Sequence, residues 1–167
     1  MNKNEDLIRR RLDDVERLQN SDKFEEAIEV CNEIISVDSE CYMAFSRRGD
    51  IYHGMGMHEN AFRDLKKLMM LRPDCPSAYY VSARWNLELG NDQAVVDDAN
   101  FVVKSGEPYF IKMAYFFRAL AFLSLGNKAK ALDDCHKLPD EFRTAVTTYK
   151  TGWQVLSRAD LMKMITN

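Results

Sequence analysis

The stretch from Ala44 to Pro73, AFSRRGDIYHGMGMHENAFRDLKKLMMLRP, decides the fold of this chain. Its first half places small Ala44 and Gly49 in an apolar helical run, and Gly56 follows that run. Two helices approach closely only where no bulky side chain lies between them, and a glycine that can adopt positive φ ends a helix. The second half repeats apolar residues at the i, i+4, i+7 spacing of a helical stripe: Ala61, Leu65, Leu68. The stretch therefore predicts two packed helices joined by a tight turn.

The same spacing of small and aromatic residues recurs along the chain. Ala78 and Gly90 stand one period after Ala44 and Gly56. A further copy contains Ala114, Tyr115, Ala119, Phe122 and Gly126. A fainter copy lies upstream and contains Val15, Leu18, Ala27, Cys31 and Ile34. A fixed period of this kind is typical of solenoid proteins, in which stacked units share a continuous core.

This spacing resembles the tetratricopeptide repeat, a helix-turn-helix unit of about 34 residues, over nearly the whole chain. The resemblance implies an all-α, right-handed helical-hairpin solenoid with about four repeats, forming one tetratricopeptide-like domain over residues 1–167. The repeats are expected at 5–40, 42–75, 76–110 and 111–139. The first helices are expected near 5–20, 42–55, 76–89 and 111–125. The second helices are expected near 24–37, 58–71, 92–104 and 128–137.

After Leu138 the repeat fades, and the segment 140–167 is expected to cap the solenoid with one or two helices. Apolar residues in this segment stand among polar ones at helical spacing: Phe142, Val146, Tyr149, Trp153, Leu156, Leu161, Ile165. A cap is required because the last repeat would otherwise leave an apolar face in water.

Composition and charge exclude several classes of partner. The net charge of −3 and the pI near 5.7 disfavour nucleic acid, whose phosphates attract clustered Lys and Arg. Charged residues near the amino terminus leave no room for a secretory signal, and no run approaches 18 apolar residues, so no membrane span is predicted. The four cysteines form no C-x-x-C pair and are interpreted as reduced thiols of a cytoplasmic protein.

No constellation of residues predicts an enzyme, a metal site or a cofactor. Asp50 and His53 share one helical face but have no third ligand nearby, so they are interpreted as a surface pair. Cys31 and Cys135 occupy equivalent places on the packed side of second helices, where cysteine acts as a small apolar filler. The acidic pairs Asp97–Asp98 and Asp133–Asp134 are interpreted as solvated.

The resemblance implies that the first helices line a concave surface that binds a peptide or helix of a partner protein. The residues expected to contact this partner are Met43, Ser46, Asp50, His53, Tyr80, Arg84, Leu87, Met113 and Phe116. Arg9, Leu12 and Glu16 extend the same face into the first repeat. An alternative for the carboxyl-terminal end of the face is that the capping helices cover Phe116, Leu120 and Leu123.

One subclass of the family grips the carboxylate tail of heat-shock proteins with Lys, Asn and Arg side chains. The matching places here hold Leu12, Glu16, Arg47, Ser77 and Val81 in one frame. In the other frame they hold Ser46, Asp50, Val81, Met113 and Phe117. Neither frame supplies the converging donors that a carboxylate needs, so this clamp is not expected.

The predicted function is therefore that of an adaptor or scaffold that binds another protein. Two alternatives remain open at this point. The chain also resembles small cytoplasmic repeat chaperones, and an immunity-type inhibitor of one dedicated client has the same sequence features. The oligomeric state is not predicted.

Overall fold

The computed structural model describes residues 3–167, and over that range the chain forms nine helices and one two-stranded antiparallel sheet. It divides into two compact units, the first ending at Asp74 and the second running from Cys75 to Asn167. Each unit is described by itself below. The single domain expected over 1–167 stays a prediction.

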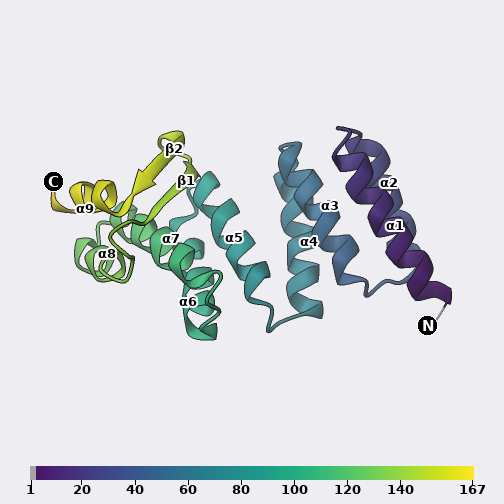
Figure 1. Ribbon diagram of the computed structural model, residues 1–167, viewed down its shortest axis with the longest axis horizontal. Coiled ribbons are helices and arrows are strands. Elements are labelled where there is room, and N and C mark those ends of the chain that lie inside the picture. Colours follow the sequence, from purple (N-terminus) through teal and green to yellow (C-terminus); the bar gives the residue numbers. More distant parts are fainter. Residues whose placement is uncertain (1–2) are drawn as a thin grey trace. The chain divides into compact units, whose positions relative to one another are not determined.

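The first unit consists of two helical hairpins. Its helices are α1 (Lys3–Gln19), α2 (Phe24–Val37), α3 (Tyr42–Gly54) and α4 (His58–Leu71), and Figure 1 shows neighbouring helices packed side by side. A buried cluster joins α1, α2 and α3 through Val15, Ala27, Cys31, Ile34, Cys41, Ala44 and Ile51. Removing these side chains from water stabilises the stack by roughly 25 cal/mol for each Å² of apolar surface.

The second unit begins with two more hairpins. Its helices are α5 (Pro76–Leu89), α6 (Asp92–Ser105), α7 (Ile111–Ser124) and α8 (Lys128–Cys135). Pro76 stands in the first turn of α5, where its missing N–H is not needed, and Gly90 ends that helix with φ +77°. The predicted helix bounds lie close to the observed ones at each end, so the helical-hairpin architecture of the repeats is confirmed.

The expectation of capping helices from residue 140 onward is wrong for the first half of that segment. Residues Arg143–Thr148 form strand β1 and Gly152–Ser157 form strand β2, paired with Val146 opposite Gln154 and Thr144 opposite Leu156. The segment holds many β-branched and aromatic residues, which favour strands, and Gly152 takes φ +66° at the start of β2, directly after the turn. The helical spacing of its apolar residues was therefore misleading.

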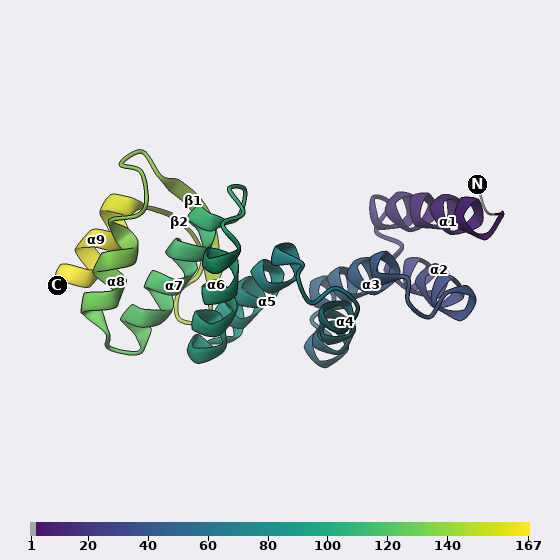
Figure 2. The same cartoon turned by 90° about the horizontal axis from the view of Figure 1, so that it is seen from below.

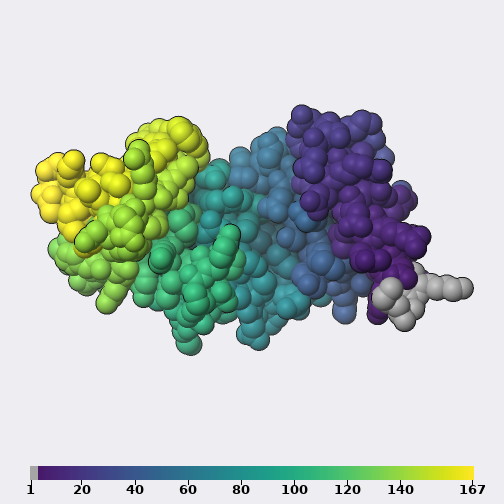
Figure 3. Space-filling view, viewed as in Figure 1, coloured from purple at the N-terminus to yellow at the C-terminus, as the bar shows by residue number. Residues whose placement is uncertain are grey.

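A capping helix does follow the hairpin. Helix α9 (Arg158–Thr166) begins with a reciprocal cap in which Asp160 N donates to Ser157 Oγ and Ser157 N donates to Asp160 Oδ2. Leu161 and Ile165 from α9 join the main core of this unit together with Leu156 of β2. Figure 2 shows the hairpin and α9 beside α7 and α8, and Figure 3 shows this yellow segment seated on the green helices.

Two aspartates that were expected to be solvated are not. Asp134 is 5% exposed and accepts two hydrogen bonds from Arg118. Asp98 is half-buried and accepts a hydrogen bond from Asn86. Their neighbours Asp97 and Asp133 are exposed as expected, because adjacent residues of a helix point in different directions.

Candidate functional site

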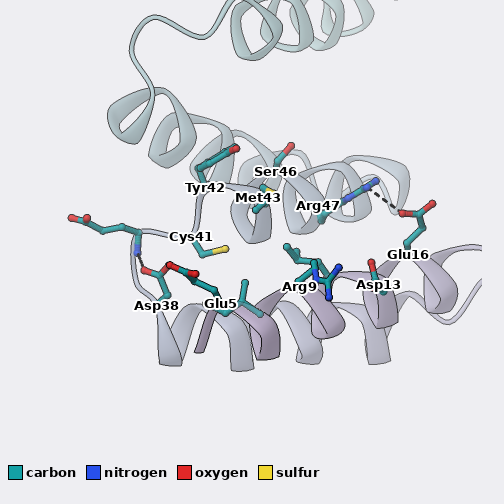
Figure 4. A pocket seen from close by; sticks show the side chains of 13 residues that line it. Glu5, Arg9, Asp13, Glu16, Asp38, Cys41, Tyr42, Met43, Ser46 and Arg47 are labelled. Carbon is teal, nitrogen blue, oxygen red and sulfur yellow. Dashed lines mark hydrogen bonds and ion pairs between the residues drawn. The ribbon is translucent and has the colours of Figure 1, made fainter. Parts of the chain in front are cut away.

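A groove of the first unit lies between α1 and α3. It has a volume of about 880 Å³, and the two helices and the loop before α3 supply its walls. The residues that line it are Glu5, Ile8, Arg9, Leu12, Asp13, Glu16, Asp38, Glu40, Cys41, Tyr42, Met43, Ser46 and Arg47. Figure 4 shows Arg9 and Asp13 on one helix and Met43 and Arg47 on the other, on opposite sides of the groove.

Apolar side chains form the floor of this groove. Ile8 and Leu12 pack against the core of the first unit from α1, and Met43 of α3 leaves 43% of its surface exposed. The ring of Tyr42 is held by Arg72, whose guanidinium carbon lies 4.6 Å from the ring centroid. An exposed methionine beside apolar neighbours is an adaptable contact for a bound chain, because the thioether side chain can change rotamer to fit it.

Acidic side chains dominate the rim. Five carboxylates line the groove against two guanidinium groups. One of these guanidinium groups, Arg47, already pairs with Glu16 at 3.4 Å, and the other, Arg9, lies 3.8 Å from Asp6 outside the groove. Figure 4 shows Asp38 and Glu5 at one end of the groove and the Arg47–Glu16 pair at the other. The groove therefore has a negative rim over an apolar floor.

The structure brings together part of the predicted contact set in this groove. Met43 and Ser46 line it, as do Arg9, Leu12 and Glu16. Asp50 and His53 lie further along α3 and are not among its lining residues. His53 instead meets His58 of α4 edge-on, with ring centroids 5.3 Å apart.

Three more of the predicted residues line a separate cleft in the second unit. Tyr80 and Arg84 of α5 and Met113 of α7 face strand β1 and Trp153 across a cleft of about 290 Å³. The ring of Tyr80 stacks on that of Phe110 at 4.9 Å, and burial raises the pKa of its hydroxyl while Arg84 opposes that shift. The hairpin thus occupies part of the surface that the repeat pattern assigned to a partner.

The remaining two predicted residues are covered by the carboxyl-terminal segment. Phe116 is fully buried and its ring lies 5.3 Å from that of Phe142, so the assignment of Phe116 as a contact residue is corrected. Leu87 is 3% exposed and borders a small cavity of about 150 Å³ beneath Tyr149 at the hairpin tip. The strands and α9 together provide the cover that the alternative interpretation assigned to helices alone.

Sequence reasoning missed the acidic rim. The helical faces that were projected from α1 and α3 contain neither the loop residues Asp38 and Glu40 nor Asp13, which is next to Leu12 in the sequence. The usable signal was local charge: residues 5–16 and 38–40 hold more acidic groups than the first helices of the later repeats.

The described residues contain no arrangement that suggests catalysis. In the part of the chain that the structure describes, no three His, Cys, Asp or Glu side chains gather closely enough to hold a metal ion. Burial raises the pKa of Cys31 to about 12, and it also raises the pKa of Cys135, which disfavours the nucleophilic thiolate form of both side chains. Their places in the two cores agree with the predicted role as apolar filler. Among the described helices, none combines the length and apolarity needed to cross a membrane.

The stacked pairs of antiparallel helices in both units define a helical-hairpin repeat protein. Residues 44–75 match the family model of the tetratricopeptide repeat. This segment therefore contains a tetratricopeptide repeat, in agreement with the resemblance seen in the sequence. No curated relative matches the chain.

Solved structures share this fold at low sequence identity. The crystal structure of MamA protein superposes with a TM-score of 0.69 at 22% identity, covering 78% of this chain and 70% of that one. YrrB, described as a TPR protein with an unusual peptide-binding site, superposes with a TM-score of 0.66 at 16% identity. The match covers 75% of this chain and 64% of YrrB. PilW, a type IV pilus biogenesis factor, superposes with a TM-score of 0.69 at 10% identity. The match covers 82% of this chain and 61% of PilW. At these identities the likeness is one of fold.

Proposed function

We propose that this protein is an adaptor or scaffold that binds a segment of a partner protein in the groove between α1 and α3. The observation that carries this proposal is the groove itself: an open trough of about 880 Å³ with an apolar floor and a charged rim. A combination of apolar contacts and a few polar groups is typical of peptide-binding surfaces. The peptide-binding site named for YrrB, which shares the fold, adds support.

The groove of the first unit is favoured over the corresponding surface of the second unit because of its exposure. In the second unit, Tyr80, Arg84 and Met113 already face strand β1. Between α1 and α3, in contrast, Met43 lines the groove and stays 43% exposed. The five lining carboxylates also argue against nucleic acid and against carboxylate tails as ligands, since both carry negative charge.

Site-specific photocrosslinking tests the proposal. A photoreactive amino acid replaces Met43 inside the groove or, as the matched control, Met70, which is 70% exposed on α4 and is not among the residues that line the groove. After irradiation in an extract of the native host, position 43 is expected to yield discrete crosslinked partners that position 70 does not. Identical products from both positions would remove the groove as the binding site.

The alternative function is that of a small chaperone or immunity-type inhibitor of one client. It predicts stable copurification with a single protein that is insoluble when produced alone, whereas an adaptor exchanges among partners.

All four cysteines are free thiols, which fits the proposed cytoplasmic location. Cell fractionation with an antibody against the chain tests that location.

A further inference from the structure

We propose that the groove between α1 and α3 selects a cationic amphipathic helix, with an apolar face flanked by Lys or Arg residues. This inference rests on the proposed function, because it names the chemistry of the segment bound at the same site. Three properties of the groove carry it: its net negative charge, its apolar floor and its length.

The charge of the lining excludes acidic segments. Five carboxylates and two guanidinium groups leave the groove with an excess of negative charge. Asp13 and Glu40 are exposed, and among the described residues their carboxylates make none of the observed side-chain hydrogen bonds or ion pairs. A Lys or Arg brought beside them gains a charge-assisted contact, whereas an acidic residue meets repulsion.

The floor requires an apolar face on the same segment. Leu12 and Ile8 are half-buried, Tyr42 is fixed by Arg72, and Met43 stands exposed between them and the solvent. A purely polar cationic chain would leave this floor in water and gain little. An apolar face that covers this floor removes its surface from water, which favours binding by roughly 25 cal/mol for each Å² of apolar surface buried.

The length and walls of the groove favour a helix. Its lining on α1 runs from Glu5 to Glu16 mostly at spacings of three and four residues, which is one face of that helix over about 16 Å at about 1.5 Å per residue. Helical walls present ridges and grooves that accept the ridges of a third helix. About three turns of a bound helix therefore match the trough.

Arg9 provides an internal check on the electrostatic argument. It lies within the groove and is exposed, with Asp6 as its partner at 3.8 Å. Replacing it by Gln makes the groove more negative, while replacing Asp13 and Glu40 by their amides makes it less negative. The two changes should move the affinity for a cationic helix in opposite directions.

The test uses a displayed library of random-sequence peptides long enough for three helical turns, panned against the full chain. Enriched peptides are synthesised with a fluorophore, and their dissociation constants are measured by anisotropy for wild type, Asp13→Asn/Glu40→Gln and Arg9→Gln. The matched control is Glu25→Gln/Glu29→Gln, which removes the same charge from exposed positions of α2 outside the groove. Circular dichroism verifies that each variant is folded.

We expect the enriched peptides to combine Lys or Arg with an apolar helical face and to crosslink from position 43. Their affinity should fall about threefold to tenfold in Asp13→Asn/Glu40→Gln, rise in Arg9→Gln, stay unchanged in the control, and weaken with added salt. Peptides that crosslink from position 43 but are neutral or acidic, or that ignore both charge changes, would overturn the cationic inference and leave the proposed function standing. Enriched peptides that crosslink equally from positions 43 and 70 would overturn both.

Discussion

Arg118 and Asp134 form a two-point ion pair that ties α7 to α8. Arg118 Nε donates to Asp134 Oδ2 at 2.8 Å and Arg118 Nη2 donates to Oδ1 at 2.6 Å. The third nitrogen, Nη1, donates to Asn100 Oδ1 of α6 at 2.6 Å. One guanidinium therefore joins three consecutive helices, and its planar fork matches the carboxylate geometry.

The same arrangement occurs in the first unit, two repeats earlier in the chain. Arg48 of α3 donates to both oxygens of Asp64 on α4 at 2.7 Å, and its remaining nitrogen donates to Asn32 of α2. The Asp64 side chain is 4% exposed and the Arg48 side chain 17%. Within each unit, an ion pair of this kind fixes the spacing of the second hairpin against the helix before it.

Removing one partner of the Arg118–Asp134 ion pair is expected to destabilise the folded protein. Arg118→Met leaves the buried Asp134 carboxylate without its partner and should lower the free energy of unfolding by about 2–4 kcal/mol. The double variant Arg118→Met/Asp134→Leu should recover much of that loss, because no charge is left buried. Urea denaturation followed by circular dichroism measures both values.

An exposed pair serves as the control for this cycle. Arg17 contacts Asp14 at 2.7 Å, but its side chain is 75% exposed, so Arg17→Met should cost less than about 0.5 kcal/mol. A loss for Arg118→Met no larger than that of Arg17→Met would contradict the role assigned to the buried pair.

The third repeat lacks this arginine. Ser82 stands one period after Arg48, and Asp98 stands one period after Asp64. Burial raises the pKa of Asp98, although hydrogen bonds from Ser82 and Asn86 act in the opposite direction. The folded state therefore holds the proton of Asp98 more tightly than the unfolded state does.

This shift gives stability a defined dependence on pH. Because the folded-state pKa of Asp98 is raised, its contribution is favourable at low pH and is lost as the pH rises through the ordinary carboxyl pKa toward the raised value. Asp98→Asn should stabilise the protein at neutral pH by up to about 1 kcal/mol, and the gain should vanish in acid. Thermal denaturation across pH measures it, with exposed Asp97→Asn as the control. A gain that persists in acid would show that charge is not its cause.

The tip of the hairpin docks on a glycine. A Cβ atom added at Gly90 would lie 2.5 Å from Cδ1 of Tyr149, whereas one added at Gly126, which has the same φ of +77°, would meet nothing within 4 Å. Gly126→Ala should therefore cost about 1 kcal/mol from backbone strain alone. Gly90→Ala should cost about 1 kcal/mol more, because the ring must move.

A third variant separates the two causes. In the background of Tyr149→Ala, the difference between Gly90→Ala and Gly126→Ala should disappear, and chemical denaturation of each protein reports it. Equal costs for both glycines in the wild-type background would mean that the ring of Tyr149 does not rest on Gly90.

The sequence predicted the helical hairpins well because local rules agree with the packing there. Gly56 and Gly126 take positive φ directly after the C-cap residues of α3 and α7, and Ala44 and Ala119 are buried where small residues were expected. The small size or the backbone freedom of each of these residues is enough to predict its place in a hairpin. The fixed period of the repeat then predicts the equivalent places along the chain.

The carboxyl-terminal hairpin was not predicted because two patterns compete in one segment. Phe142, Val146 and Tyr149 follow helical spacing, yet the run Thr144–Thr148 favours a strand. In the structure Val146 is buried while Tyr149 is 52% exposed, so the apparent helical stripe has no physical face. The groove was predicted only in part, because its acidic rim includes a loop that no helical projection contains.

The two tryptophans offer a direct test of the hairpin. Trp85 on α5 is 1% exposed and Trp153 on β2 is 70% exposed. Trp153→Phe should therefore leave a blue-shifted emission that acrylamide hardly quenches, with stability changed by less than about 0.5 kcal/mol. Trp85→Phe should leave a red-shifted emission that is quenched readily. If residues 143–157 formed an amphipathic helix instead, Trp153 would lie on its apolar face with Val146 and Leu156, and acrylamide would then fail to quench the Trp85→Phe variant.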